Sequence, residues 1–306
     1  MKKNDIINKL DNRTWGLKSA TIINAVAKYS TVVTSLFFSA VLARILSPED
    51  YGIVAVVTVF TNFFTLFSDM GIGTAVVQKK ELDTNNLNGI FSFTIVLGCV
   101  LALSFSAFSL ILVRVYNNTA YFTVGPILGV TLALNAMNMV PNAILMRNKK
   151  FVVNAFRTIT TAILSSVGAL IVALLGGKYY AIVAQSFLSS FLILVWNIKS
   201  TGVHPSFRYA RTGIKMIWGY TFYQFAFNFV NYFSRNLDNL LSGYCFGDVA
   251  LGYYDKAYKL MRYPVDNLTN VISPSMQPIL SDHQNDVKYV EMQYNKLAKL
   301  LSVIAV

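Results

Sequence analysis

Long apolar runs separated by short polar connectors make up nearly the whole chain. Each run has the length, about 20 residues or more, that an α-helix needs to cross a ~30 Å hydrocarbon core. The pattern predicts an all-α integral membrane protein, a polytopic helical bundle with eight complete transmembrane helices and the start of a ninth. The eight complete runs are Ser19–Leu46, Gly52–Val77, Gly89–Val113, Tyr121–Met146, Phe151–Gly176, Tyr179–Ile198, Gly213–Ser242 and Ala250–Leu280, and the ninth begins near Leu297.

The composition agrees with this class and excludes several others. Hydrophobic residues make up 55% of the chain and charged residues only 13%, whereas a soluble domain has about 25% charged residues. A soluble enzyme, a disordered chain and a nucleic-acid-binding module are therefore excluded, so no nucleic-acid partner is expected. No Walker-type loop, metal-ligand spacing or nucleophile–base constellation is found, which predicts neither an enzyme nor a cofactor or metal site.

The net charge of +12 follows the topology. Basic residues crowd the N-terminal segment and the connectors around Lys79, Lys149, Lys199 and Lys288. The connectors between them hold only two basic residues, Arg114 and Lys178. Because Lys and Arg concentrate in cytoplasmic loops, the alternation predicts a cytoplasmic N-terminus.

Two outward hairpins indicate an internal repeat. Residues 43–52 and 243–252 both combine a helix end, a short acidic turn and a glycine that opens the next helix. Six apolar runs separate the hairpins, and an even number preserves orientation, so the two lobes would be parallel repeats about an axis along the membrane normal. The predicted organisation is a cytoplasmic N-terminal segment (1–18), a first six-helix bundle (19–198), a cytoplasmic linker (199–212) and the beginning of an incomplete second bundle (213–306).

The hairpin motifs carry a family resemblance. Residues 42–55 read LARILSPEDYGIVA and residues 69–78 read DMGIGTAVVQ; the second half has RNLD at 235–238, LGYYDKAYKL at 251–260, and Pro264 and Pro274. Along the whole chain this resembles the oligosaccharide flippase family, the polysaccharide-transporter branch of the multidrug/oligosaccharidyl-lipid/polysaccharide (MOP) exporter superfamily. The resemblance implies two bundles with 12 to 14 helices in total that open alternately to each side. About four further spans would then follow Val306, so the chain resembles a truncated copy.

The resemblance also implies a function. The family moves undecaprenyl-pyrophosphate-linked oligosaccharide units across the bacterial cytoplasmic (inner) membrane for surface polysaccharides such as capsule, exopolysaccharide and lipopolysaccharide. The expected partners are that lipid-linked oligosaccharide and the bilayer, and a glycosyltransferase or polymerase complex is left open. Two alternatives stay open as well: a multidrug-type antiporter, and a non-transporting scaffold in a glycan-assembly complex.

Ionisable residues inside the spans are the candidate site, because a charge in a membrane helix usually faces a cavity or a partner. Their spacing on the eighth run, at i, i+4, i+7 and i+11, forms one polar stripe. The stripe is either a cationic cavity wall for a diphosphate or a self-satisfied salt-bridge ladder. The cationic candidates are Lys28, Arg44, Arg235, Lys256, Lys259 and Arg262, and their charge partners are Asp69, Asp238, Asp255 and Asp266.

Four charges in the first lobe are assigned from their depth. Lys28 lies about 15 Å into the first run and is expected to face the interior. Arg44 is either an interfacial anchor or part of a portal, and Asp69 either pairs with Lys28 or caps a broken helix end. Arg157, six residues into its run, is expected to snorkel to the interface.

Overall fold

A computed structural model describes residues 17–232, 234, 261, 275–282 and 286–305. All regular structure in these ranges is helical. Seven of the ten candidate site residues lie outside them: Arg235, Asp238, Asp255, Lys256, Lys259, Arg262 and Asp266. The eighth predicted span and the second outward hairpin also lie almost wholly outside the described residues.

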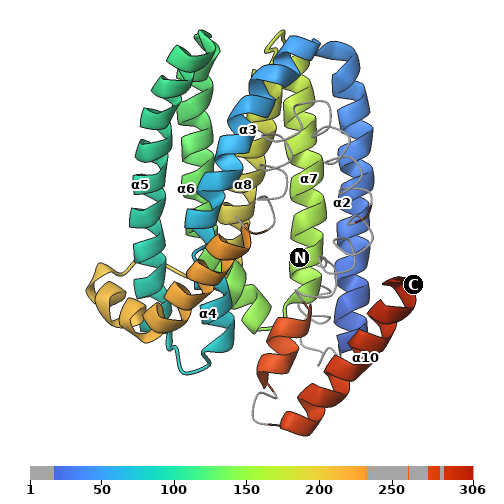
Figure 1. Cartoon of the computed structure of the whole chain (residues 1–306), viewed down its shortest axis with the longest axis vertical. Coiled ribbons are helices and arrows are strands. Elements are labelled where there is room, and N and C mark those ends of the chain that lie inside the picture. Colours follow the sequence, from blue (N-terminus) through green and yellow to red (C-terminus); the bar gives the residue numbers. More distant parts are fainter. Residues whose placement is uncertain (1–16, 233, 235–260, 262–274, 283–285, 306) are drawn as a thin grey trace.

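The described chain forms an upright helical bundle (Figure 1). Six of its helical segments are long and apolar enough to span a membrane, and they match the first six predicted spans. The elements are α2 (Leu17–Ile45), α3 (Pro48–Asp69), α4 (Ile72–Gln78), α5 (Thr84–Tyr116), α6 (Ala120–Arg147), α7 (Phe151–Leu174), α8 (Tyr180–Thr201), η1 (Phe207–Tyr209), helices over 210–232 and 275–282, and α10 (Val287–Ala305).

Small residues let the helices approach closely. α6 packs along α5 on one side and α8 on the other; α7 joins α8 to α2, and α3 lies against α6 and α5. A Cβ added at Gly98 would lie 2.9 Å from the backbone oxygen of Ala133, and one at Gly129 would lie 2.8 Å from that of Ala102. In lipid, the hydrophobic effect does not drive helices together, so close packing of this kind stabilises their association instead.

The second predicted span, Gly52–Val77, is broken. α3 ends at Asp69, and both Met70 (φ 36°) and Gly71 (φ 71°) are left-handed before α4 begins at Ile72. A Cβ at Gly71 would lie 2.5 Å from Cγ of Gln224, so glycine also permits the close approach of the helix over 210–232. The break changes the direction of the chain, so that α4 packs in a hydrophobic core cluster with α5, α6 and Ile217.

The hairpin motif of the first lobe is a helix cap. The backbone N–H of Asp50 donates to the hydroxyl of Ser47 (3.3 Å), and the carboxylate of Asp50 accepts from the backbone N–H of Ser47 (3.0 Å). The second carboxylate oxygen of Asp50 accepts from the backbone N–H of Tyr179 at 3.1 Å. Asp50, 7% exposed, thus ties the α2–α3 hairpin to the start of α8.

The last described helix does not match the predicted ninth span. α10 begins at Val287 rather than near Leu297, and it is not among the six candidate spans of the described chain. It carries Lys288, Glu291, Lys296 and Lys299 along its length and lies obliquely at one end of the bundle (Figure 1). A ninth membrane span is therefore not confirmed.

Candidate functional site

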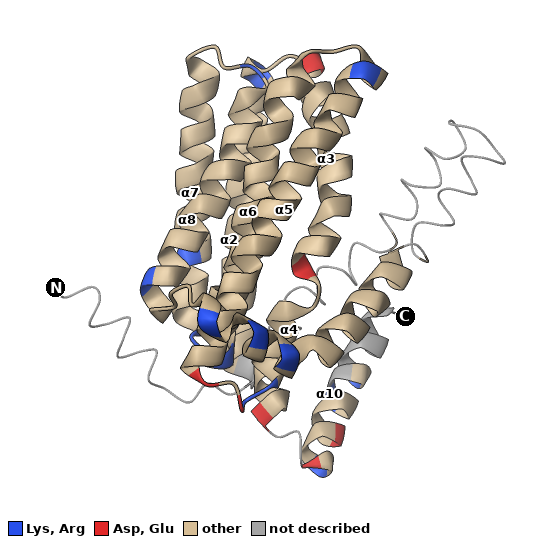
Figure 2. Cartoon of the chain, turned by 90° about the vertical axis from the view of Figure 1, so that its left-hand side faces the viewer, with Lys and Arg blue, Asp and Glu red and all other residues tan. Residues whose placement is uncertain are grey.

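Positive charge gathers at one end of the bundle. The connectors after α4, α6 and α8 meet there, and Figure 2 shows Lys and Arg side by side at that end. We call it the basic end. The opposite end carries the α2–α3, α5–α6 and α7–α8 connectors, with Arg44, Arg114 and Lys178. The connectors rich in basic residues therefore lie at one end of the bundle and those poor in them at the other, as the sequence predicts.

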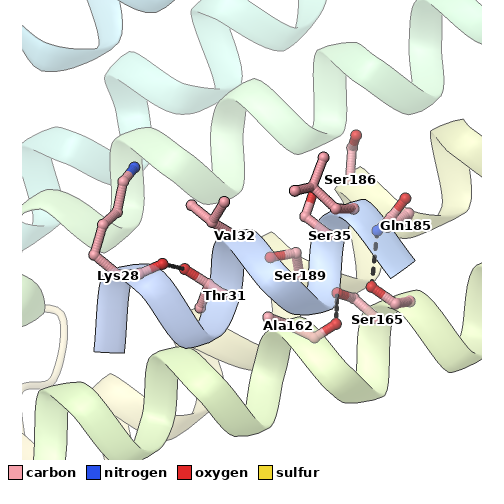
Figure 3. A pocket seen from close by; sticks show the side chains of 11 residues that line it. Lys28, Thr31, Val32, Ser35, Ala162, Ser165, Gln185, Ser186 and Ser189 are labelled. Carbon is pink, nitrogen blue, oxygen red and sulfur yellow. Dashed lines mark hydrogen bonds between the residues drawn. The ribbon is translucent and has the colours of Figure 1, made fainter. Parts of the chain in front are cut away.

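Lys28 lines a cavity of about 460 Å³ between α2, α7 and α8 (Figure 3). Most of the other lining side chains are neutral and polar. They are Thr31 and Ser35 from α2, Ser165 and Ser166 from α7, and Gln185, Ser186 and Ser189 from α8. Among the described residues, no ion pair reaches Lys28. A cation without a carboxylate partner inside a polar cavity can take an anionic ligand.

A second cavity, of about 440 Å³, adjoins the first. The two share Ser35 and Gln185, and the second continues along α2 and α3 past Ser39, Tyr51 and Thr58. We refer to both together as the hydroxyl groove. Neither lining set includes Asp or Glu. The groove therefore suits a cargo that is rich in hydrogen-bonding groups and is not cationic.

The other two candidates in the described residues, Arg44 and Asp69, do not line this groove. Arg44 is exposed in the last turn of α2, roughly 24 Å along the helix from Lys28 at ~1.5 Å per residue. Asp69 ends α3, where the helix breaks. No ion pair between described residues joins Asp69 to Lys28, so the structure does not bring these two together.

Arg157 does not snorkel, which corrects the sequence-based expectation. Its side chain is only 6% exposed and points into the bundle. One terminal nitrogen donates to the amide oxygens of Asn142 (3.1 Å) and Asn197, and the other donates to that of Asn154. Asn197 in turn donates to Asn138. Amides from α6, α7 and α8 thus accept from both terminal nitrogens of the guanidinium, while its buried Nε has no hydrogen-bond partner among the described residues.

This asparagine cage is the feature that the sequence analysis missed. The signal was present in the asparagines of the apolar runs. Asn135, Asn138 and Asn142 recur on one face of α6, because residues three and four apart are neighbours. Asn135 accepts from Ser190 of α8 at 2.8 Å. Polar side chains in a span usually face another helix, and here they join three.

Residues 275–282 dock at the basic end. Asn24 of α2 donates to the hydroxyl of Ser275 at 2.8 Å, and the hydroxyl of Ser281 donates to the backbone oxygen of Val77 at 3.3 Å. Asp282 forms ion pairs with Lys80 and Lys149. Burial alone would raise the pKa of Asp282, but hydrogen bonds from Lys149 and Lys80 outweigh it and hold the pKa below its ordinary value.

Comparison with protein families gives one match over most of the chain. A family described as polysaccharide biosynthesis protein matches residues 41–306. The teichuronic acid biosynthesis protein TuaB of Bacillus subtilis is 22% identical over 247 residues, which cover 80% of this chain and 51% of TuaB. The lipopolysaccharide biosynthesis protein WzxC of Escherichia coli is 22% identical over 295 residues, covering 91% of this chain and 58% of WzxC. The chain spans a little over half the length of these curated relatives.

Solved structures share the fold. A MOP superfamily transporter from Pyrococcus furiosus matches with a TM-score of 0.66 at 14% identity, over 95% of this chain and 72% of that one. An outward-facing multidrug resistance transporter of the MATE family in the same superfamily matches with a TM-score of 0.62, also at 14% identity, over the same shares. The helical bundle thus has a MOP-like transporter fold.

Proposed function

The chain belongs to the polysaccharide biosynthesis protein family, and from that premise we propose that it is the first part of a flippase for lipid-linked oligosaccharides. The proposed cargo is an oligosaccharide on undecaprenyl pyrophosphate, carried to the outer face of the bacterial cytoplasmic membrane. The helices up to α8 form one lobe, and the helix over 210–232 begins a second. The two lobes open alternately to each side, with the cargo between them.

One observation carries the proposal: inside the apolar membrane bundle, a cavity with several hydroxyl groups holds Lys28, which forms no ion pair with any described residue. Lys28 supplies the charge and the hydroxyl groove supplies hydrogen-bonding groups. A glycan cannot cross lipid unless its hydroxyls are hydrogen-bonded, since an unsatisfied polar group costs several kcal/mol in hydrocarbon. A diphosphate needs cations in a medium of low dielectric constant, where each contact is stronger than in water.

The wider cation set extends this site. Arg235, Lys256, Lys259 and Arg262, with Asp238, Asp255 and Asp266 beside them, are proposed to line the second-lobe wall that faces Lys28. Arginine offers a fork to a phosphate and lysine offers a point charge. Arg44 is proposed as an anchor at the far interface, because it is exposed in the last turn of α2.

The orientation follows from the basic end. Because cytoplasmic loops carry most Lys and Arg, the basic end and the N-terminus are proposed to be cytoplasmic. Residues 275–282, which bridge α2 and α4 at that end, must then move away when the cavity opens to the cytoplasm.

The lining of the hydroxyl groove also distinguishes this proposal from a multidrug antiporter. The MOP-like fold is shared by multidrug transporters, so the fold alone does not separate the two. A multidrug antiporter that takes cations needs acidic lining residues, and neither cavity lining contains any. The anionic cargo is favoured on this ground.

Restoration of surface polysaccharide in a flippase-deficient bacterial strain tests the proposal. The full-length protein is expected to restore it, and the Lys259→Ala/Arg262→Ala variant is expected to fail although it reaches the membrane. A full-length protein that reaches the membrane without restoring polysaccharide contradicts the proposal. If that protein instead confers drug resistance the antiporter is supported, and if it retains glycosyltransferases in a pull-down the scaffold is supported.

A further inference from the structure

The hydroxyl groove differs in chemistry from a phosphate site. The side chains that line its two cavities are mostly uncharged. Among the described lining residues, Lys28 and the phenol of Tyr51 are the ionisable groups. Lys28 lies toward one end of the set, and Ser35, Gln185 and Ser186 lie further along α2 and α8 (Figure 3). A ligand that fills both cavities therefore meets Lys28, a series of neutral polar groups, and apolar side chains between them such as Val32 and Val54.

Several groove hydroxyls are available to a ligand. Four other hydroxyls of the groove donate back to a carbonyl of their own helix, namely those of Thr31, Thr58, Ser165 and Ser186. Ser35, Ser39 and Ser189 make no hydrogen bond to any described residue. Each hydroxyl offers one donor and two acceptor positions.

Gln185 also offers a hydrogen-bonding group to a ligand, at the place where the two cavities meet. Its side-chain nitrogen donates to the hydroxyl of Ser166 at 2.9 Å, which fixes the plane of the amide. Ser166 is buried in the bundle, so the amide is anchored on its protein side. The amide oxygen then remains as an acceptor at the place that both cavities share.

On these grounds we propose that the hydroxyl groove is the glycan-binding subsite of the first lobe, and this rests on the proposed function. Sugar hydroxyls both donate and accept, as do the serine hydroxyls and the glutamine amide. The groove volume, the sum of two cavities that each exceed 400 Å³, is within the range of small-molecule sites. Lys28 contacts the phosphate that joins the first sugar, and the polyprenyl chain stays outside in lipid.

The subsite also predicts selectivity. A site built to hydrogen-bond a ligand hydroxyl rejects a ligand that lacks it, because the buried polar groups are then left unpaired. The first lobe would therefore distinguish glycans, while the cations would bind any polyprenyl pyrophosphate.

The test measures cysteine protection in proteoliposomes that contain the full-length protein. In a Cys99→Ser/Cys245→Ser background, Ser189→Cys places a thiol in the groove. Thr119→Cys places one at an exposed position of the α5–α6 connector as a control. A water-soluble methanethiosulfonate reagent labels thiols that reach water as thiolates. The added probes are lipid-linked oligosaccharide from the membranes of the organism that carries the gene, and undecaprenyl pyrophosphate without sugar.

The lipid-linked oligosaccharide is expected to slow labelling of the Ser189→Cys variant about tenfold, while undecaprenyl pyrophosphate leaves it unchanged. Adding Gln185→Leu should raise the concentration needed for half-protection about tenfold, the effect of losing one buried hydrogen bond. Equal protection by both probes overturns the subsite, and so does an absence of protection in a variant that still flips the lipid. Absence of flipping by the full-length protein without any substitution overturns the proposed function instead.

Discussion

Two cations of the first lobe, Arg157 and Lys28, illustrate opposite ways of keeping charge inside a membrane bundle. Arg157 is buried, and asparagine oxygens from three helices surround it. Lys28 lines an open cavity and has no ion-pair partner among the described residues. The difference shows that depth alone does not identify a substrate-binding charge. Arg157, whose terminal nitrogens donate to amides of three helices, holds those helices together, and Lys28, which forms no ion pair with a described residue, is available to a ligand.

The largest expected effect on stability follows from replacing Arg157, the cation inside the asparagine cage. Arg157→Met removes the donors to Asn142, Asn154 and Asn197, and each orphaned oxygen costs about 1 kcal/mol. The free energy of unfolding should fall by about 3 kcal/mol. Denaturant titration in mixed micelles, followed by tryptophan fluorescence, measures this loss.

Arg157→Lys is the matched control for that variant. Lysine keeps the charge but lacks the planar fork, so an intermediate loss is expected. An unfolding midpoint in Arg157→Met equal to that of the wild type would show that the cage has no structural role.

The next largest effect on stability is expected from Asp50, which lies outside both the asparagine cage and the hydroxyl groove. Asp50→Ala removes the capping box with Ser47 and the bond from the Tyr179 N–H, and the loss of such a cap costs about 1–2 kcal/mol. Glu49→Ala, one residue earlier and exposed, is the control and should cost less. Equal losses would mean that the motif acts through general charge at the helix start instead of through the cap.

A smaller, pH-dependent effect on stability is expected from the ion pairs of Asp282 with Lys80 and Lys149. Because Lys149 and Lys80 lower the pKa of Asp282, the ion pairs stabilise the fold above the ordinary carboxyl pKa of about 3.9. This contribution is lost as the pH falls through the lower pKa of the folded state. A half-exposed pair is worth about 1 kcal/mol or less.

Unfolding curves between pH 6 and pH 3 measure that contribution. The wild type should be more stable than Asp282→Asn at pH 6, and the difference should disappear toward pH 3. A constant difference over this range would assign it to something other than the charge of Asp282.

The smallest expected effect on stability is that of Lys28. Lys28→Met removes a cation that forms no ion pair with described residues, so the free energy of unfolding should change by less than about 0.5 kcal/mol. A loss comparable to that of Arg157→Met would show that Lys28 is a structural cation too, and the contrast between the two would collapse.

Much of the fold could be predicted from the sequence because lipid restricts the backbone so strongly. Every backbone polar group in hydrocarbon must be bonded within its own helix, so the lengths of the apolar runs already locate the six spans. The position of the break after Asp69 was less predictable, because the close approach of Gln224 to Gly71 comes from a helix more than 130 residues further along the chain.

The site was predicted less completely, for a physical reason. A depth argument placed Lys28 inside the bundle, and Lys28 does line a cavity. The same argument failed for Arg157, because its partners come from α6 and α8 and meet it only after the helices pack. The acidic hairpin was interpreted as a family signature, and the structure adds its local cause, a cap that also holds α8.

The central claim, that Lys28 in the cavity between α2, α7 and α8 binds the cargo, is tested most directly by flipping in proteoliposomes. The full-length protein is reconstituted with lipid-linked oligosaccharide, and the fraction exposed on the other leaflet is followed with a membrane-impermeant glycosidase. Lys28→Met should flip at least about tenfold more slowly than the wild type, the effect of losing one charge-assisted contact, while Lys178→Met, in the connector before α8, should flip at the wild-type rate. A Lys28→Met protein that flips as fast as the wild type would contradict the account.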